Sequence, residues 1–256
     1  MTHTDEQAKT ALITGAAGGI GRAIAVALAS QGWRLMITDR DEAALRETRQ
    51  HCLSHTRQVQ TRALDVTRQE EVVDAIEYTL ESFGRLDGFV SNAGVSGVVK
   101  PVADFPVDVF EHTMAVNTNG TFLCLKHALP ALQKSGGGSF VAIASTSAIR
   151  GRAGLSAYVA SKHAVLGLVR CAALEIIGTA VRVNAVLPGP TRTAMIDAIN
   201  EMARQGNTEG REIGRAAAAP YAQPEDVANV VTFLLSPQAS HMNGAALVVD
   251  GASTVA

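Results

Sequence analysis

The sequence predicts a protein of the α/β class, built on a doubly wound sheet of seven parallel strands with helices on both faces. Three observations predict this architecture. Short apolar runs, typical of buried strands, alternate with longer helix-compatible runs along the 256 residues, and such alternation is typical of a parallel sheet. A glycine-rich turn from Gly15 to Gly21 directly follows the first apolar run. Hydrophobic residues make up 47% of the chain, which is enough for a sizeable core.

The N-terminal half begins with a strand, a helix and a second strand. Residues 10–14, Thr-Ala-Leu-Ile-Thr, predict a short buried strand, and the alanine-rich residues 22–30 predict a helix. The further elements expected in this half are a strand at 33–38, a helix near 41–53, a strand near 59–64, a helix near 68–83 and a strand at 87–90.

The C-terminal half continues the alternation. Residues 107–132 predict one long helix, with Pro130 bending its last turn. The other expected elements are a strand at 138–144, a helix at 156–177 and strands at 181–187 and 246–249. Because no linker, low-complexity segment or internal repeat divides the chain, we expect one domain over residues 1–256, with residues 1–8 flexible.

The glycine-rich turn predicts a dinucleotide site. Its spacing is Gly15-x3-Gly19-x-Gly21, and it lies between a strand and a helix. Glycines allow a tight turn and a close approach of the backbone to a ligand, and the helix amino end offers free N–H groups to a pyrophosphate. This arrangement favours a sheet of the Rossmann type.

Asp39 predicts which dinucleotide binds. It ends the second expected strand, 18 positions after Gly21, close to the spacing of about 20 typical of the acid that binds the adenosine ribose. Its carboxylate would accept hydrogen bonds from the ribose hydroxyls and repel a 2′-phosphate, so NAD(H) is favoured over NADP(H). The neighbouring Arg40 leaves an alternative open, because an arginine there could hold a 2′-phosphate. The glycine turn contains no basic residue to assist it.

Tyr158 and Lys162 are candidates for proton transfer. They lie four residues apart in an expected helix, so their side chains project from one face. A neighbouring ammonium favours the phenolate, so we expect Lys162 to lower the pKa of Tyr158. A tyrosine tuned in this way can exchange a proton near neutral pH. The alternative is a half-buried tyrosine packed on the stem of a lysine.

Seven short motifs occur along the chain in a fixed order. They are Thr14-Gly15-x3-Gly19-Ile20-Gly21, Asp65-Val66, Ser91-Asn92-Ala93-Gly94, Asn117, Ser145, Tyr158-x3-Lys162 and Pro188-Gly189-x3-Thr193. Together they resemble the short-chain dehydrogenase/reductase family, in its single-domain branch of about 250 residues. The resemblance covers residues 9–251. One departure is Ser91, where the family usually has an asparagine.

The resemblance implies a catalytic role for four residues. Tyr158 would act as the general acid and base, and Lys162 would stabilise its phenolate and hold the nicotinamide ribose. Ser145 would orient the substrate oxygen, and Asn117 would hold a water in a proton relay. From the pattern and the resemblance together, the expected cofactor contacts are Gly15, Gly19, Ile20, Gly21, Asp39, Arg40, Asp65, Val66, Asn92, Ala93, Gly94, Tyr158, Lys162, Pro188, Gly189, Thr191 and Thr193.

Some of these contacts have simpler alternatives. Asp65 would reach the adenine, but it could instead cap the helix that follows. Asn92 to Gly94 would let the nucleotide lie close to the backbone, and residues 188–193 would fix the nicotinamide end through the Thr191 backbone and the Thr193 hydroxyl. Either segment could also be a plain turn.

The substrate is not predicted beyond an alcohol or ketone. Residues 195–219 occupy the position of the family's variable substrate lid, and the stretch 201–212 within them is polar, charged and glycine-containing, which suits mobility. Four arginines near the site could bind a carboxylate or phosphate, although solvated or salt-bridged arginines are commoner: Arg150, Arg152, Arg211 and Arg215. His51 and His55 have metal-ligand spacing beside Cys52, but a third ligand is not evident, so no metal is predicted.

Composition excludes several other classes. The net charge of −2 provides no basic surface for nucleic acid, and no apolar run reaches the roughly 18 residues of a membrane span. The polar start of the chain is unlike a signal peptide, and three cysteines, Cys52, Cys124 and Cys171, suit a reducing cytoplasm. Small and apolar residues on more than one helix face suggest partner helices, and the resemblance implies a homotetramer that is a dimer of dimers.

These observations favour an oxidoreductase that transfers a hydride between NAD(H) and a secondary alcohol or ketone. An NADPH-dependent carbonyl reductase of the 3-oxoacyl type is the alternative. A non-catalytic dinucleotide sensor would predict a damaged tetrad, whereas Asn117, Ser145, Tyr158 and Lys162 are all present. A nucleotide-sugar epimerase would resemble a longer chain with different glycine spacing and a separate C-terminal domain.

Overall fold

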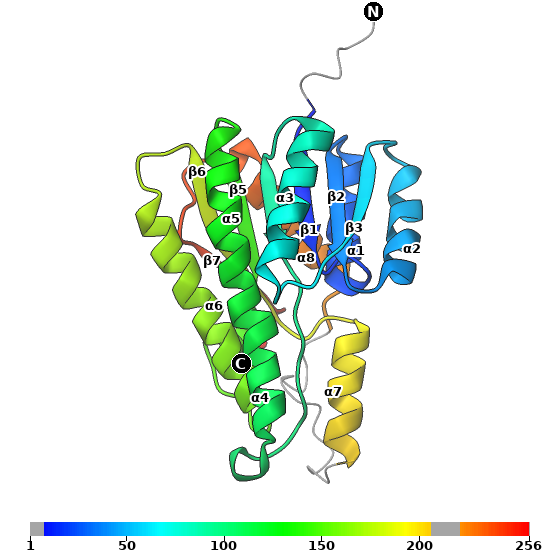
Figure 1. The fold of residues 1–256 in the computed structure, drawn as a ribbon. Coiled ribbons are helices and arrows are strands. Elements are labelled where there is room, and N and C mark those ends of the chain that lie inside the picture. Colours follow the sequence, from blue (N-terminus) through cyan, green and yellow to red (C-terminus); the bar gives the residue numbers. More distant parts are fainter. Residues whose placement is uncertain (1–7, 206–220, 256) are drawn as a thin grey trace, which may run out of the picture.

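The computed structural model describes residues 8–205 and 221–255 and contains the predicted seven-stranded parallel sheet (Figure 1). The strand order is β3-β2-β1-β4-β5-β6-β7, which confirms the Rossmann-type fold. The strands are β1 Thr10–Thr14, β2 Arg34–Asp39, β3 Val59–Ala63, β4 Gly88–Ser91, β5 Gly138–Ile143, β6 Val181–Pro188 and β7 Ala246–Val249.

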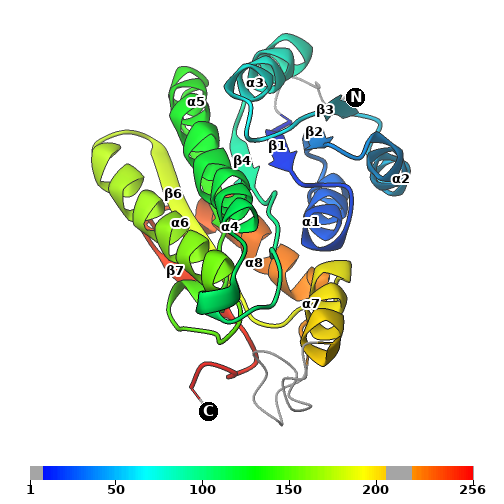
Figure 2. The same cartoon turned by 60° about the horizontal axis from the view of Figure 1, so that its bottom comes forward.

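Two helical layers cover the sheet, as Figure 2 shows. One layer packs α3, α5 and α6 against one face, and the other packs α1, α2 and α8 against the opposite face. Helices α4 and α7 extend beyond the carboxyl edge of the strands (Figure 1). The helices are α1 Gly19–Ser30, α2 Glu42–Leu53, α3 Gln69–Phe83, α4 Val107–Met114, α5 Gly120–Lys134, α6 Ser156–Glu175, α7 Ala194–Gln205 and α8 Pro224–Leu235.

The strands are apolar on both faces because each face is covered. Along β1, Leu12 belongs to the core under α3 and α5, whereas its neighbours Ala11 and Ile13 belong to the core under α1 and α8. Successive side chains of a strand point to opposite faces, so a strand buried on both sides is an unbroken apolar run. This is why short apolar runs were sufficient to locate the strands.

The prediction of one helix over residues 107–132 is wrong in one respect. A π-helical segment, η3 Ala115–Asn119, separates α4 from α5. Asn117 lies in this segment with its side chain fully buried and hydrogen-bonded to the backbone of Val95. π-helical turns often occur at functional sites. The wider turn around Asn117 therefore indicates that this residue has a functional role. Pro130 lies inside α5, which continues to Lys134.

Two helices were not predicted from the sequence. The segment expected to form a lid begins with α7, and the rest of it, residues 206–219, lies outside the described residues, as do residues 1–7 of the segment expected to be flexible. The start of helix α8 could have been predicted from the sequence, because a proline is common at the first position of a helix and Pro224 occupies it. In the structure, Asp226 accepts a hydrogen bond from the Gln223 N–H, as in a capping box. Within the described ranges, no helix is long and apolar enough to span a membrane.

Candidate active site

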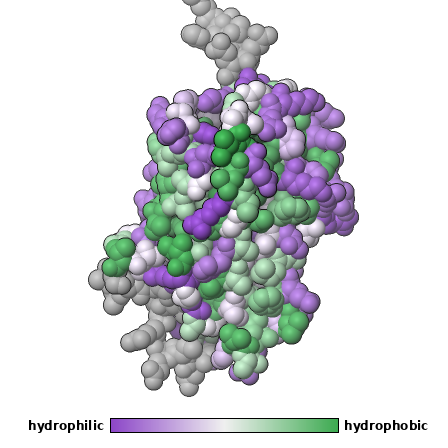
Figure 3. All heavy atoms as spheres, turned by 90° about the vertical axis from the view of Figure 1, so that its left-hand side faces the viewer, coloured by the Kyte–Doolittle hydropathy of each residue, from purple (hydrophilic) through white to green (hydrophobic). Residues whose placement is uncertain are grey.

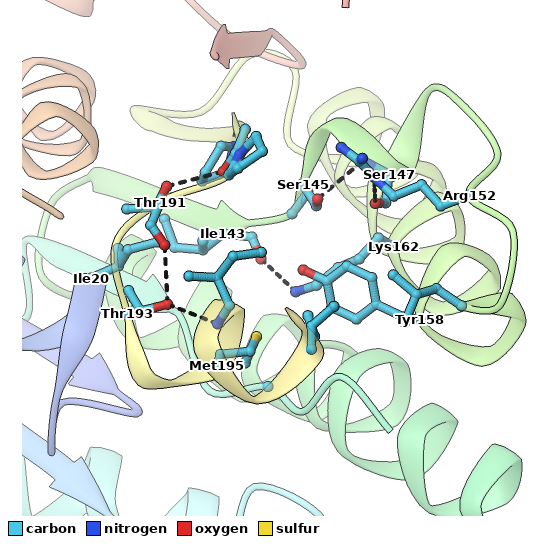
Figure 4. Close-up of a pocket in the computed structure, with 18 of the residues that line it drawn as sticks. Ile20, Ile143, Ser145, Ser147, Arg152, Tyr158, Lys162, Thr191, Thr193 and Met195 are labelled. Carbon is cyan, nitrogen blue, oxygen red and sulfur yellow. Dashed lines mark hydrogen bonds between the residues drawn. The ribbon is translucent and has the colours of Figure 1, made fainter. Parts of the chain in front are cut away.

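A groove and a pocket lie side by side at the carboxyl edge of the sheet, where ligands of open α/β sheets bind. Both are lined by Ile20, Asn92, Gly94, Thr193 and Met195, so they form one continuous depression. Figure 4 shows the pocket, with the turn of Thr191 and Thr193 on one side and Ser145, Tyr158 and Lys162 on the other. The groove continues past the amino end of α1 to Asp39 and Asp65.

The glycine turn is shaped by close contacts that no side chain could share. Gly15 adopts a φ of +66°, and a Cβ there would lie 2.7 Å from Cα of Ala93. A Cβ on Gly21 would collide with the carbonyl oxygen of Gly15. Since α1 starts at Gly19, the unpaired N–H groups of its first turn border the groove. This cradle therefore fits the diphosphate of a dinucleotide.

Thr14 and Asn92 hold the glycine turn against the end of β4. The Asn92 side-chain amide donates to the carbonyl oxygens of Thr14 (3.1 Å) and Gly15 (2.8 Å). The Thr14 hydroxyl in turn accepts from the N–H groups of Asn92 and Ala93. Asn92 thus lines the groove and also braces it. Thr14 belongs to the first motif, but no contact at the site was predicted for it from the sequence. A hydroxyl at the end of a buried strand could have indicated this role.

The end of the groove that lies beyond the carboxyl ends of β2 and β3 carries the predicted acids. Asp39 accepts hydrogen bonds from the N–H groups of Ala17 (3.0 Å) and Asp41 (3.1 Å), which fixes its carboxylate at the groove wall. Arg40 is largely exposed and lies 3.8 Å from Asp65. Asp65 lines the groove, and its carboxylate accepts from the N–H and hydroxyl of Thr67. It does not cap α3, whose N-cap residue is Arg68.

Charge and hydrogen bonding keep Asp65 ionised. Burial acts to raise its pKa, but the hydrogen bonds from Thr67 and the charges of Arg40 and Arg68 outweigh burial, so the pKa of Asp65 is lowered. Val66 beside it is buried and lines the same groove. A Cβ on Gly120, the first residue of α5, would lie 2.7 Å from the Val66 side chain.

Ser145, Tyr158 and Lys162 converge on the pocket, as predicted. Ser145 lies two residues after the end of β5 in extended conformation, and its hydroxyl accepts from the Ser147 N–H at 3.0 Å. Tyr158 and Lys162 project from the first two turns of α6, with Lys162 Nζ 5.7 Å from the centre of the Tyr158 ring. The Lys162 ammonium donates to the carbonyl oxygen of Ile143 at 2.8 Å. Sequence positions 145, 158 and 162 are thereby brought to one wall.

The expected pKa shift of Tyr158 is wrong in direction. Burial is the largest influence and raises the pKa of Tyr158, while a hydrogen bond with Ser145 and the charge of Arg152 lower it less. Burial likewise lowers the pKa of Lys162 to about 8. A buried site disfavours both charged forms, and this burial could not be inferred from the four-residue spacing. Arg152, rather than Lys162, is the cation that counteracts it.

Asn117 lies behind the pocket rather than in its wall. Its side-chain oxygen accepts from the Val95 N–H at 2.8 Å, and its amide donates to the Val95 carbonyl and the Ser161 hydroxyl, both at 2.9 Å. A Cβ on Gly94 would lie 3.1 Å from this oxygen and 3.6 Å from Lys162 Nζ, so Asn117 and Lys162 are near neighbours. Ser161, which the sequence did not single out, anchors Asn117 to α6.

The turn after β6 closes the junction between pocket and groove. Pro188, Gly189 and Thr191 line the pocket, and the Thr191 hydroxyl donates to the carbonyl oxygen of Gly189 at 3.0 Å. The Thr193 hydroxyl donates to the carbonyl oxygen of Thr191, and its methyl group would lie 3.1 Å from a Cβ on Gly19. The turn therefore meets the glycine-rich loop, as a site spanning both would need.

The four candidate arginines separate into three groups. Arg152 lines the pocket, where it donates to the hydroxyls of Ser147 and Thr146. Arg150 is not among the lining residues and donates to the carbonyl oxygen of Ser253 at 2.6 Å. Arg211 and Arg215 lie outside the described residues.

His51 is exposed in the last turn of α2, His55 is exposed just beyond the end of that helix, and Cys52 is buried. Among the described residues, no group of three or more histidine, cysteine, aspartate or glutamate side chains could hold a metal ion.

Known proteins share this sequence and architecture. A family model described as enoyl-(acyl carrier protein) reductase matches residues 15–254. Levodione reductase of Leifsonia aquatica is 34% identical over 255 residues, which cover 97% of this chain and 95% of that protein. A solved structure of actinorhodin polyketide ketoreductase with NADPH has a TM-score of 0.91 at 30% identity, with 98% of each chain covered. Carveol dehydrogenase of Mycobacterium avium, solved in complex with NAD, has a TM-score of 0.90 at 28% identity, with 99% of this chain and 100% of that chain covered.

Proposed function

The chain belongs to the short-chain dehydrogenase/reductase family, and we propose that it transfers a hydride between NAD(H) and a secondary alcohol or ketone. The observation that carries this proposal is the convergence of Ser145, Tyr158 and Lys162 on a pocket continuous with the dinucleotide groove. The names of its relatives support the substrate class, since they describe reductases of a dione and a polyketide ketone and a dehydrogenase of carveol.

Tyr158 is the proposed general acid and base. When bound, the nicotinamide supplies or accepts the hydride, and the protein supplies position and proton transfer. Tyr158 takes the hydroxyl proton during alcohol oxidation and returns a proton to the oxygen during ketone reduction. Ser145, already hydrogen-bonded with Tyr158, holds that oxygen against the phenol. Because burial raises the pKa of Tyr158, its phenolate depends on the positive charge of Lys162 and Arg152.

Asn117 is proposed to support this proton transfer from behind the pocket. It fixes the backbone of Val95 and lies close to Lys162 Nζ on the far side of Gly94. The polar route from Lys162 towards Asn117 is the place where a water could relay protons.

Asp39 supports NAD(H) as the preferred cofactor. Its carboxylate is fixed at the adenosine end of the groove by two backbone N–H groups, where it would meet the ribose hydroxyls. A 2′-phosphate would be repelled there. Arg40 supports the second candidate, an NADPH-dependent carbonyl reductase, because it lines the same groove, and the ketoreductase relative was solved with NADPH.

The cofactor preference can be measured by titrating the nicotinamide fluorescence of NADH and NADPH. We expect wild type to bind NADH at least about tenfold more tightly, a difference of about 1.4 kcal/mol. Asp39→Ser should reduce the preference for NADH over NADPH, because the serine hydroxyl would not repel a 2′-phosphate. Asp41→Ser is the matched control, because Asp41 caps α2 and is not among the groove-lining residues. Tighter binding of NADPH by wild type would reject the NAD(H) assignment, and binding of neither would reject the dinucleotide site.

We further propose a homotetramer. Figure 3 shows apolar side chains gathered on the face formed by the α6 and β7 side of the molecule. On that side, Leu174 on α6 is 69% exposed and Val248 on β7 is 43% exposed. Helix α5, which contacts α6, exposes a further apolar side chain, Phe122, at 48%. Exposed apolar side chains grouped on one face are typical of interfaces. We also propose a reducing, cytoplasmic location, since all three cysteines are free.

A further inference from the structure

The charged residues of the substrate pocket all have the same sign. Among the described residues that line it, Arg152 and Lys162 are the only charged side chains, and neither an aspartate nor a glutamate is present. Lys162 belongs to the proposed proton-transfer machinery. Arg152 contributes positive charge near Tyr158, but no step of the proposed hydride transfer requires it to contact the substrate. A partly buried arginine is an uncommon choice for a pocket that only needs to hold a neutral ketone.

Arg152 is held in place by neutral groups. Its Nε donates to the Ser147 hydroxyl and its Nη2 to the Thr146 hydroxyl, both at 2.9 Å. Figure 4 shows the guanidinium lying beside Ser147, next to Ser145. No carboxylate within the described ranges is ion-paired with it, whereas Arg22, Arg40, Arg46, Arg62, Arg68, Arg85 and Arg204 each have an acidic partner.

The surroundings of Arg152 make its charge costly. Burial and the charge of Arg150 lower the pKa of Arg152 to about 10, so the guanidinium still carries its charge at neutral pH. A partly buried cation that lacks an anion is unfavourable, and an anion that reaches it forms short, strong hydrogen bonds. The Nη1 group has no hydrogen-bond partner among the described residues, which leaves donors for such a ligand.

The guanidinium of Arg152 lies in the same pocket as Ser145 and Tyr158. We propose that Arg152 binds an oxyanionic group of the substrate, so that the preferred substrate is a ketone or secondary alcohol carrying a carboxylate or a phosphate. This inference rests on the proposed function, since the reacting oxygen is placed at Ser145 and Tyr158. Leu155, Ile196 and Ile199 line the same pocket and would contact the apolar remainder of such a molecule.

Two other roles of Arg152 predict different results. As a counter-charge for the Tyr158 phenolate, Arg152 would assist turnover of every substrate, charged or neutral. As a support for the turn of Thr146 and Ser147, it would act through the placement of Ser145, again for every substrate. Only direct contact with the substrate anion makes the effect depend on the charge of the substrate. The informative quantity is therefore a ratio of kcat/KM values.

The experiment compares 3-, 4- and 5-oxoalkanoates with their methyl esters, with NADH as the reductant. A phosphate monoester of a small hydroxyketone forms a second arm that distinguishes phosphate from carboxylate. We expect wild type to favour the best anion over its neutral analogue by roughly 10- to 100-fold. Arg152→Met should remove that preference, lowering kcat/KM for the anion by roughly 10- to 100-fold more than kcat/KM for its methyl ester, because hydrogen bonds to charged groups carry the difference. Arg152→Lys should retain part of the preference, since it keeps the charge but not the planar fork.

Arg150→Met is the matched control, because Arg150 is a neighbouring arginine outside the pocket lining, and the ratio should stay at the wild-type value. The proposal is overturned if wild type reduces the esters as well as the acids, or if Arg152→Met slows both equally. Continued ester reduction in either case leaves the proposed function standing. If no ketone is reduced at all, the proposed function fails, and calorimetric titration with 4-oxopentanoate then decides: binding that Arg152→Met abolishes supports the anion site, and absent binding rejects it.

Discussion

A buried tyrosine can act as a base near neutral pH only when a nearby positive charge stabilises its phenolate. At Tyr158 the sequence identified the residue and its neighbour Lys162, but not the balance of forces on them. Burial raises the pKa of Tyr158 and lowers that of Lys162 to about 8. The spacing of four residues reports which side chains share a helix face, whereas burial depends on what packs above that face. Residue identity was therefore predictable, and the direction of the shift was not.

Removal of the Tyr158 hydroxyl should stop the reaction without unfolding the site. We expect Tyr158→Phe to lower kcat by at least about a hundredfold, because general acid–base catalysis contributes about 100- to 10,000-fold. NADH affinity should change little, since the ring is retained. Steady-state kinetics and fluorescence titration measure the two effects. Tyr78→Phe on α3, outside both the pocket and the groove, is the matched control, and a Tyr158→Phe enzyme with normal turnover would contradict the mechanism.

Burial of the charged Lys162 side chain should lower the free energy of unfolding by an amount that depends on pH. Its folded pKa of about 8 lies below the ordinary value of 10.5, so between these pH values the unfolded chain binds the additional proton and stability rises with pH. Below pH 8 Lys162 is protonated in both states, and the folded protein carries the full cost of burying its charge. Lys162→Met should therefore be more stable than wild type at pH 7 by about 2 kcal/mol, after allowing for the lost hydrogen bond to Ile143.

Urea unfolding at pH 7 and pH 9.5 tests this dependence. The advantage of Lys162→Met should shrink at the higher pH, where wild-type Lys162 is already neutral in the folded state. An advantage of equal size at both pH values would mean that Lys162 keeps an ordinary pKa in the fold. The same variant should be inactive, because the proposed phenolate would lose its ammonium.

At the scale of elements, the strands were predicted to within a residue or two because most of them are short apolar runs between turn residues. Strand β3, Val-Gln-Thr-Arg-Ala, is the exception. Segment η3 was not predicted, because its wider turn accompanies hydrogen bonds between Asn117 and Val95, 22 residues apart. Helix α7 was missed because residues 195–219 were interpreted as a substrate lid, although its buried residues Ile199 and Ala203 lie four apart, as on one face of a helix. Segment η3, in contrast, depends on a partner elsewhere in the chain.

The glycine turn should tolerate a methyl group at one position and not at another. Gly21→Ala is expected to lower the free energy of unfolding by about 1–3 kcal/mol, because its Cβ would collide with the Gly15 carbonyl and the turn would have to shift. Gly18→Ala is the matched control, since nothing lies within 4 Å of its Cβ position. Denaturant unfolding measures both. Equal loss of stability in the two variants would contradict the crowding argument.

At the scale of the whole molecule, the covering of both sheet faces was predictable from strands that are apolar on both sides. The sequence did not predict which apolar side chains stay exposed, because their exposure depends on how each helix is rotated about its axis on the sheet. Phe122 on α5 and Leu174 on α6 remain substantially exposed even though both helices contribute to the core.

A charged residue on this exposed surface should weaken assembly. We expect Phe122→Glu to shift the proposed homotetramer towards dimers or monomers, because a carboxylate would be buried at the interface without a partner. Light scattering after size-exclusion chromatography measures the mass. Gln31→Glu, which adds the same charge at the exposed end of α1, should leave the mass unchanged. An unaltered tetramer in Phe122→Glu would exclude this surface from the interface.

The strand order has a consequence for how the protein folds. Strand β1 pairs with β4 across a long stretch of chain, and the groove lies where their carboxyl ends meet. Contacts between distant parts of a chain form slowly, so the first helices and strands can assemble well before Thr14 meets Asn92. During refolding, recovery of dinucleotide binding should therefore lag behind recovery of helical circular dichroism. The cofactor site would be among the last parts of the molecule to exist.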